Sequence, residues 1–305
     1  MRLGIIDIGS NSIKLLIGER SQLGQFEQIL FAVEEKRIGE GMTLNPPRIL
    51  EGDIQKAAKA IARLHQMAGQ YELTNLKIVA TSAVRDAVNQ REFSKAILDT
   101  TGIGVDILSG DEEARLIGKG ALQDPELFDL RNFVLIDLGG GSMECIQFED
   151  RIQGTHRSFN LGAVRLASTC IQDREKPLHQ KSERSIEERV IHALSQSPIG
   201  PNPAIRTAVL TGGASSVMGS LLSSRSNTAS ATISDLRRLS GEICSANLEE
   251  RVTSLGIPRE RADIFPAAAI IIKTALEFLE CDTARFTRFN LRAGLIAEML
   301  ANEIS

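Results

Sequence analysis

The chain contains two copies of one short pattern, and this repeat constrains the fold more than any other feature. IIDIGSNSIKLLIGE covers residues 5–19, and LIDLGGGSMECIQFE covers residues 135–149. The copies align in a single register, 130 positions apart, which matches Asp7 with Asp137, Gly9 with Gly139 and Ser12 with Ser142. In each copy, two β-rich runs flank a turn of glycine and small polar residues. The repeat therefore predicts two domains of similar plan, each beginning with a β-hairpin.

The rest of the chain alternates β-rich and amphipathic segments. FEQILFAVEEKRIG (residues 26–39) predicts a third strand that joins the first hairpin in an antiparallel meander. Apolar residues at helical spacing predict a helix over residues 53–71 with Asp53 as its N-cap, and residues 207–222 predict a strand, a glycine turn and a helix. A chain of 305 residues, 42% of them hydrophobic, is long enough for two domains. We therefore expect an α/β fold with one domain over residues 1–124, a second over residues 125–290, and a final helix over residues 291–305 that packs back on the first.

Charge and composition exclude several classes of protein. The chain has 35 basic and 39 acidic residues, a net charge of −4, whereas general binders of nucleic acid or of membrane surfaces carry a basic excess. No apolar run reaches about 18 residues, and Asp7 interrupts the segment where a signal peptide keeps its apolar core. We therefore expect a cytoplasmic protein with neither nucleic-acid nor membrane partners. The cysteines and histidines are too scattered to predict a disulfide framework or a zinc site.

The two turns suit an anionic ligand. Glycine lets the backbone approach an anion closely, successive N–H groups form a concave nest for it, and hydroxyl side chains add donors. An aspartate beside phosphate oxygens is repulsive unless a divalent cation lies between them, and magnesium favours a mixture of carboxylate, water and phosphate oxygens. The alternative is that each turn is an ordinary glycine-rich hairpin. This alternative would suffice for one such turn, but it does not explain why two copies occur in register. The repeat thus predicts two turns that clamp one phosphate chain.

Acidic residues outside the turns are candidates for the chemistry. In SGDEEARLIGKGAL, Ser109 and Glu112 have the spacing of a capping box, and Arg115 is placed to pair with Glu112. Glu113 then has no local partner, and we expect the helix dipole to keep its carboxylate ionised, as a general base requires. Glu144 follows the second glycine turn and is a second candidate. The structural alternatives are a solvated surface acid at position 113 and an edge-strand charge at position 144.

Six segments together carry a resemblance to a known family. They are DIGSNSIKLLI, ATSAVRDAVN, SGDEEARLIGKG, VLIDLGGGSMECI, FNLGAVRL and RADIFPAAAIII. In this order they resemble the exopolyphosphatase/guanosine pentaphosphate phosphohydrolase family of the actin-like, sugar-kinase-like ATPase superfamily, in a short form without the C-terminal helical histidine-aspartate region of longer members. The resemblance implies two ribonuclease-H-like domains around a central cleft, magnesium (Mg2+) as cofactor, and hydrolysis of a terminal phosphoanhydride bond.

The resemblance also implies roles for single residues. Glu113 matches the family's water-activating glutamate, and Glu144 matches the second acid that helps to orient water or metal. Asp7 and Asp137 match the metal-side aspartates, and Arg85 matches an arginine that holds the phosphate chain. The phosphate loops correspond to Ser10, Asn11, Ser12, Gly139, Gly140, Gly141 and Ser142.

Some positions depart from the family pattern or are left unassigned. Met143 stands where the family usually has threonine, which removes one hydroxyl donor from the second turn, and Ala214 replaces a threonine in the third glycine turn. Arg37 and Arg165 lie in family-like segments and could face the cleft, but we do not assign them to the site. The apolar segment PAAAIIIKTALEFL predicts a core helix, and a homodimer contact through it is left open.

Three functions remain compatible with these residues. The first is a magnesium-dependent hydrolase that releases terminal orthophosphate from inorganic polyphosphate by base-activated attack of water, with guanosine pentaphosphate as the alternative substrate. The second is a non-catalytic sensor that binds alarmones or polyphosphate in the same cleft, and Met143 keeps this function open. A sugar kinase is disfavoured because no separate sugar-binding signature is visible. Glu113 and Glu144 favour the hydrolase, because a carboxylate near an anion weakens binding and is useful only for chemistry.

Overall fold

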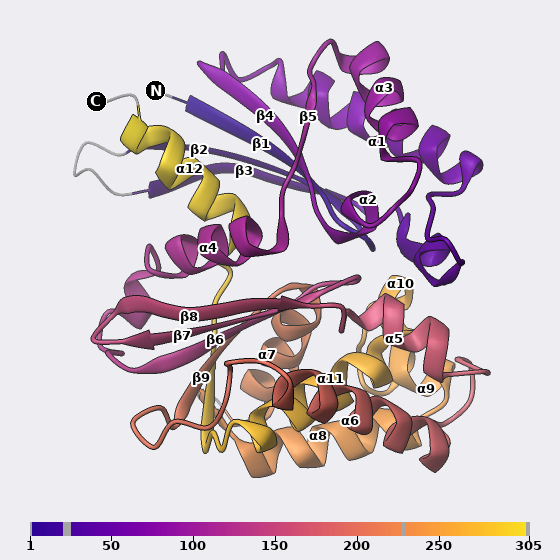
Figure 1. Ribbon diagram of the computed structural model, residues 1–305, viewed down its shortest axis with the longest axis vertical. Helices are drawn as coiled ribbons and strands as arrows, with labels where there is room; N and C mark the ends of the chain where they lie inside the picture. Colours follow the sequence, from indigo (N-terminus) through magenta and orange to yellow (C-terminus); the bar gives the residue numbers. More distant parts are fainter. Residues whose placement is uncertain (1, 21–25, 227–229, 303–305) are drawn as a thin grey trace.

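The computed structural model describes residues 2–20, 26–226 and 230–302, and its strands form two sheets, one above the other in Figure 1. The upper sheet has five strands: β1 (Arg2–Ile8), β2 (Ile13–Arg20), β3 (Phe26–Glu34), β4 (Asn75–Ala80) and β5 (Val105–Ile107). Their order is β3-β2-β1-β4-β5. β1, β2 and β3 form the predicted antiparallel meander, and β4 and β5 continue the sheet parallel to β1.

The lower sheet repeats this plan and adds one strand. It contains β6 (Phe133–Leu138), β7 (Met143–Glu149), β8 (Ile152–Phe159), β9 (Thr207–Thr211), β10 (Ser230–Thr232) and β11 (Thr283–Phe286). In the order β8-β7-β6-β9-β11, strand directions match those of the upper sheet, and β10 is added antiparallel at the edge. The repeat in the sequence is therefore a repeat of the sheet.

Helices cover the outer face of each sheet (Figure 1). The upper sheet carries α1 (Glu51–Ala68), α2 (Ser82–Arg85) and α3 (Gln90–Thr101), preceded by a 3-10 turn, η1 (Gly39–Thr43). The helices of the lower half are α5 (Ala163–Cys170), α6 (Gln180–Ser195), α7 (Gly213–Ser226), α8 (Ile233–Ser245), α9 (Leu248–Thr253), α10 (Arg259–Ala262) and α11 (Phe265–Phe278). Of these, α6, α8 and α11 lie below the sheet in Figure 1. α11 is buried along most of its length against α5, α6 and α8, so the chain itself covers the apolar helix for which a homodimer contact was left open.

Two helices lie between the sheets. They are α4 (Gly110–Ala121) and α12 (Leu291–Asn302), which pack on each other. α12 also contacts β1 and β2, while α4 contacts β7 and β8 and so joins the two halves of the molecule. β1 is buried on both faces because α1 and α12 cover it from opposite sides, which explains its nearly continuous apolar run. A short 3-10 turn, η2 (Pro125–Leu127), separates α4 from β6, and the division of the chain at residue 124 stays a prediction.

Two local predictions about helix ends need correction. α1 begins at Glu51 after Leu50, so Asp53 lies inside the first turn, where its carboxylate accepts from Lys56, and it is not the N-cap. At α4, Ser109 Oγ does accept from the Glu112 amide, but the hydrogen-bond partner of Arg115 is Glu298 of α12, which it binds through both guanidinium Nη atoms. Within the described residues, no helix is both long enough and apolar enough to span a membrane.

Candidate functional site

The turns of the two repeated hairpins meet between the sheets. Each turn is closed by the same backbone hydrogen bond, from Gly9 N to Ser12 O (3.1 Å) and from Gly139 N to Ser142 O (3.0 Å). They approach so closely that a Cβ added to Gly141 would lie 2.5 Å from Ser10 Oγ. A side chain at position 141 would therefore force the neighbouring serine hydroxyls to move.

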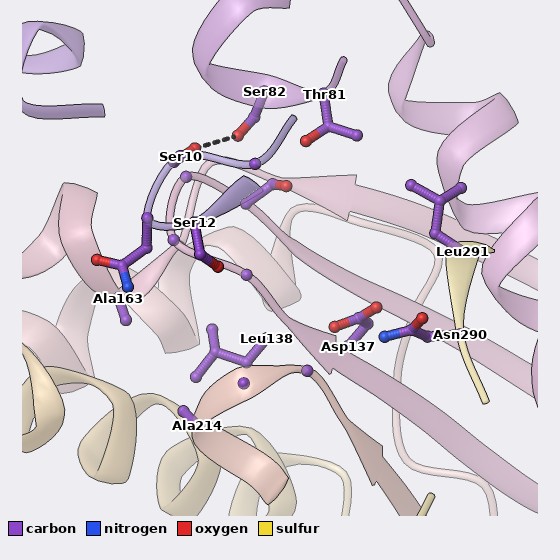
Figure 2. Close-up of a pocket in the computed structure, with 18 of the residues that line it drawn as sticks. Ser10, Ser12, Thr81, Ser82, Asp137, Leu138, Ala163, Ala214, Asn290 and Leu291 are labelled. Atoms are coloured by element: carbon purple, nitrogen blue, oxygen red, sulfur yellow. Dashed lines mark hydrogen bonds between the residues drawn. The ribbon is translucent and has the colours of Figure 1, made fainter. Parts of the chain in front are cut away.

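The two turns border one cavity of about 90 Å³, which we call the central cavity (Figure 2). Figure 2 shows Ser10 and Ser82 meeting at one side, where their hydroxyls are 3.2 Å apart, and Asp137 and Asn290 at the other. All seven predicted phosphate-loop residues of the turns line it: Ser10, Asn11, Ser12, Gly139, Gly140, Gly141 and Ser142. The four predicted acids line it as well: Asp7, Glu113, Asp137 and Glu144. Arg85 is the predicted site residue that does not border this cavity.

The hairpins place different charges at equivalent positions. In the first, Asp7 lies directly opposite Lys14 across the β1–β2 ladder; in the second, Asp137 lies opposite Glu144 across β6–β7. Directly opposed residues in a sheet are close enough to interact, with attraction for unlike charges and repulsion for like charges. The first hairpin thus carries a neutralising pair, and the second carries two acids.

Asp7 is further compensated by a residue that is distant in sequence. Arg292, the second residue of α12, donates from Nη1 to Asp7 Oδ2 at 2.5 Å, and both side chains are buried. Burial, followed by the charge of Arg292, lowers the pKa of Lys14 to about 8. Asp7 therefore faces two cations inside the fold.

Asp137 has no comparable compensation. Burial raises the pKa of its carboxyl to about 6, although Lys14 and Arg292 act in the opposite direction. Across the described parts of the chain, no group donates a hydrogen bond to this carboxylate, which is 8% exposed. A buried carboxylate of this kind attracts either a proton or a cation.

Glu113 lies in the first turn of α4. It has no partner nearby in sequence, as predicted, but it has a distant one. Arg85 Nη1 donates to its Oε2 at 2.7 Å and also to the backbone oxygen of Leu108. Burial raises the pKa of Glu113 to about 7, against the opposing effect of Arg85. Burial at a site only 6% exposed therefore opposes the stabilisation that the helix dipole gives to the ionised carboxylate.

Glu144 is buried on a central strand, since β7 lies between β6 and β8, which removes the edge-strand alternative. Its Oε1 accepts a hydrogen bond from Ser158 Oγ at 2.7 Å. Burial raises the pKa of Glu144 well above its ordinary value, and the nearby charges of Glu113 and Asp137 add to this effect. Glu113 and Glu144 thus form a pair of neighbouring acids, each with a pKa displaced upward, in one cavity.

Several residues at the site were missed or left out by the sequence reasoning. Arg165 supports the second turn, because its Nε donates to Gly141 O at 2.8 Å and its guanidinium binds Asp86. Lys14, Arg261 and Arg292 line the central cavity and were not predicted. Lys14 could have been found by extending the repeat, because it matches Glu144 in the same register. No comparable sequence signal marks Arg292, since only folding brings it to Asp7.

The two departures in the glycine turns have different consequences. Met143 is fully buried in the hydrophobic core and does not border the central cavity, so the hydroxyl that it lacks would not face this cavity. The missing hydroxyl therefore does not change the lining of the central cavity. Ala214, at the start of α7, does line the cavity.

The aspartates fit a magnesium ion bound jointly with a ligand. In the described segments, no group of three or more His, Cys, Asp or Glu side chains is arranged to hold a metal alone. Magnesium at phosphate sites is commonly held by one or two carboxylates together with water and phosphate oxygens, so a cage of protein ligands is not required. Asp137 fits this role better than Asp7, because Arg292 already binds Asp7 Oδ2.

Comparison with known proteins gives a consistent result. The model of the Ppx/GppA phosphatase family matches residues 16–303. Exopolyphosphatase 1 of Mycobacterium leprae is 27% identical, covering 99% of this chain and 91% of that protein. Exopolyphosphatase 2 of Mycobacterium tuberculosis is 28% identical, covering 89% of each.

Solved structures agree on the fold. An exopolyphosphatase from Cytophaga hutchinsonii superposes with a TM-score of 0.87 at 20% identity, covering 99% of this chain and 98% of that one. The Aquifex aeolicus member of the Ppx/GppA family gives a TM-score of 0.82 at 22% identity, covering 100% and 99%. The predicted fold class, an α/β fold of the actin-like ATPase type with two similar halves, is confirmed.

Proposed function

The chain belongs to the Ppx/GppA phosphatase family, and from this premise we propose that it is a magnesium-dependent exopolyphosphatase that acts in the cytoplasm. Its substrate would be inorganic polyphosphate, from which it releases the terminal phosphate. The observation that carries this proposal is the central cavity, where four buried carboxylates face two backbone turns of the kind that bind phosphate. If the cavity only bound phosphate, those carboxylates would lower its affinity by repelling the anion.

In the proposed reaction, water attacks the terminal phosphorus while Glu113 accepts a proton from that water. A new P–O bond forms, and the bond from phosphorus to the bridging oxygen breaks. The bridging oxygen keeps the electron pair and becomes the end of the shortened chain. Glu113 suits this role, because a base with a pKa of about 7 combines a usable ionised fraction with good affinity for a proton. Glu144, held by Ser158, would orient the attacking water.

The remaining residues would bind and position the substrate. Backbone N–H groups and hydroxyls of the two turns would hold the terminal phosphate, with Ser10 held by Ser82 and the second turn braced by Arg165. Asp137, with Asp7 beside it, would hold magnesium, which supplies positive charge that neutralises the phosphate oxygens. Arg85 is engaged by Glu113, so an incoming phosphate would compete with Glu113 for its guanidinium.

Guanosine pentaphosphate is the alternative substrate, because it carries the same terminal phosphoanhydride. The sensor hypothesis is disfavoured, since the feature that kept it open, Met143, lies in the core. The test is release of orthophosphate from polyphosphate and from guanosine pentaphosphate, with magnesium and with excess chelator. We expect magnesium-dependent release that Glu113→Gln abolishes almost completely. If the protein binds these compounds but releases orthophosphate from neither, the sensor hypothesis would replace the enzyme hypothesis.

A further inference from the structure

A second cavity, of about 600 Å³, adjoins the central cavity. The residues that line both are Lys14, Gly212, Gly213, Arg261, Asn290 and Arg292. The central cavity is small, at about 90 Å³, whereas the second is within the size range of small-molecule sites. A substrate longer than its terminal phosphate therefore needs space beyond the central cavity, and the second cavity offers that space.

The second cavity lacks the acids of the central one but shares three of its cations. Its cationic residues are Lys14, Arg261, Arg288 and Arg292, and none of the described residues on its wall is acidic. Arg292 is already bound to Asp7, and Arg261 Nη2 is bound to Glu35 at 2.9 Å. The acids that can bind a cation lie in the central cavity, whereas the second cavity is lined by cations without acids, so a polyanion with a metal at its end complements both.

Neither the side chain of Lys14 nor that of Arg288 has a hydrogen bond or ion pair to a described residue, but Lys14 is shared with the central cavity, so the cation that borders the second cavity alone is Arg288. It lies in the segment between β11 and α12 and is exposed to solvent. No hydrogen bond or ion pair joins it to any other residue in the described parts of the chain. Its guanidinium is therefore available to a ligand, and it borders the second cavity but not the central one.

Unsatisfied donors mark the border between the cavities. Thr211 lines the second cavity, is fully buried, and its Oγ1 has no hydrogen-bond partner among the described residues. It immediately precedes Gly212 and Gly213, where the 14-residue helix α7 begins. A helix N-terminus carries unpaired N–H groups and a partial positive charge, which favour an anion. A ligand oxygen at this border would thus find both charge and hydrogen-bond donors.

We propose that the second cavity binds the leaving group of the hydrolysed substrate, an oligophosphate chain that continues from the central cavity past Lys14 and Arg292. This proposal rests on the proposed function. Phe31 and Val33, which are 44% and 40% exposed, line the same cavity and provide an apolar wall. A bare polyphosphate and a nucleoside polyphosphate share the oligophosphate chemistry, and the apolar wall provides a way to distinguish them.

The first experiment compares short and long substrates. We expect Arg288→Ala to raise KM for linear polyphosphate of about 15 phosphates at least about fivefold more than KM for tripolyphosphate, the effect of one charge-assisted contact. The control is Arg238→Ala, which removes an exposed arginine of α8 that pairs with Asp235. The control should leave the ratio of the two KM values unchanged. An unchanged ratio in Arg288→Ala would overturn the proposal.

The second experiment identifies the source of the chain. Phe31→Ala is compared on guanosine pentaphosphate and on linear pentaphosphate, and the readout is the ratio of their KM values. A ratio that rises at least about threefold assigns the apolar wall to a nucleoside. An unchanged ratio, together with the Arg288 effect, assigns the cavity to bare phosphate chains.

Binding measurements separate failure of this proposal from failure of the proposed function. Calorimetric titration of the wild type and Arg288→Ala with tripolyphosphate and with the longer chain, in excess chelator, requires no turnover. If the protein releases no phosphate but binds the longer chain more tightly, and this difference depends on Arg288, the cavity assignment stands and the enzyme hypothesis is rejected. If the protein turns over substrate but neither KM nor calorimetric affinity favours the longer chain, the enzyme hypothesis stands and the cavity assignment is rejected.

Discussion

Replacing Arg85 by glutamine tests whether this arginine sets the basicity of Glu113. Arg85 and Glu113 are joined at 2.7 Å, with side-chain exposures of 19% and 7%. The pKa of Glu113 is raised to about 7 by burial even though Arg85 opposes the rise. Removing the guanidinium removes the opposing charge, so the pKa of Glu113 should rise further.

The size of the effect follows from the geometry. An opposite charge within about 4–6 Å lowers the pKa of a carboxyl by about 1–3 units. Because solvent reaches Arg85 only in part, we expect the pKa of Glu113 to rise by at least about 1 unit when the guanidinium is removed. Near pH 7 the ionised fraction of Glu113 should then fall from about one half to about one tenth or less. Turnover at pH 7 should fall at least about fivefold and recover as the pH is raised, because a general base works only when it is deprotonated.

The assay is the pH dependence of kcat on polyphosphate, measured from pH 5.5 to 9.5. The acidic limb of Arg85→Gln should lie about one pH unit or more above that of the wild type. Arg63→Gln is the matched control, since Arg63 binds Glu34 at 2.8 Å on an exposed surface, and its profile should be unchanged. If Arg85→Gln raises KM but leaves the acidic limb in place, Arg85 only holds phosphate and this reasoning is wrong.

Three further substitutions test other parts of the site. Glu113→Gln should lower turnover by about 10²- to 10⁴-fold with little loss of substrate affinity, and saturation kinetics showing wild-type turnover would exclude it as the base. Asp137→Asn should remove magnesium-dependent turnover yet stabilise the metal-free fold at pH 8 by up to about 3 kcal/mol, because the pKa of Asp137 rises from 3.8 to about 6 on folding. Stability of the wild type should accordingly fall as the pH rises from about 4 to 6, and urea unfolding in chelator that shows no such fall would contradict this. Gly141→Ala should impair substrate binding because its Cβ would lie 2.1 Å from Ser82 Oγ, and adding Ser82→Ala should restore part of the affinity measured by titration.

The fold could be predicted because its signals are local. Alternating and helical periodicity identified β1, β2, β3 and α11, and the repeated turn revealed that the sheet plan occurs twice. Helix ends were less predictable, as at Asp53, because several acidic and polar residues near a helix start compete for the same unpaired N–H groups. The exact N-cap depends on how the preceding loop enters the helix, and a residue type alone does not determine that.

The site was predictable in composition but not in electrostatics. The turns and acids were recognised from pattern and resemblance, and they line one cavity. Their charge states depend on burial and on partners far away in sequence. Arg85 and Glu113 are 28 residues apart, and Arg292 and Asp7 are 285 apart, so neither pair has a local signature. The pKa of Glu113 could not be judged before the packing of α4 between the sheets was known.

The repeat itself explains why the two hairpins cannot share one role. If both carried the Asp–Glu arrangement of the second hairpin, the central cavity would hold additional unpaired buried charge, which is costly. If both carried the Asp–Lys arrangement of the first, the compensated aspartates would have less affinity for a metal, and the acid at position 144 would be lost. Lys14 and Glu144 stand in the same register with opposite charges, each across from an aspartate. In the proposed function, the first hairpin would provide anion-binding charge toward the second cavity, and the second hairpin would provide the carboxylates that bind a cation and orient water.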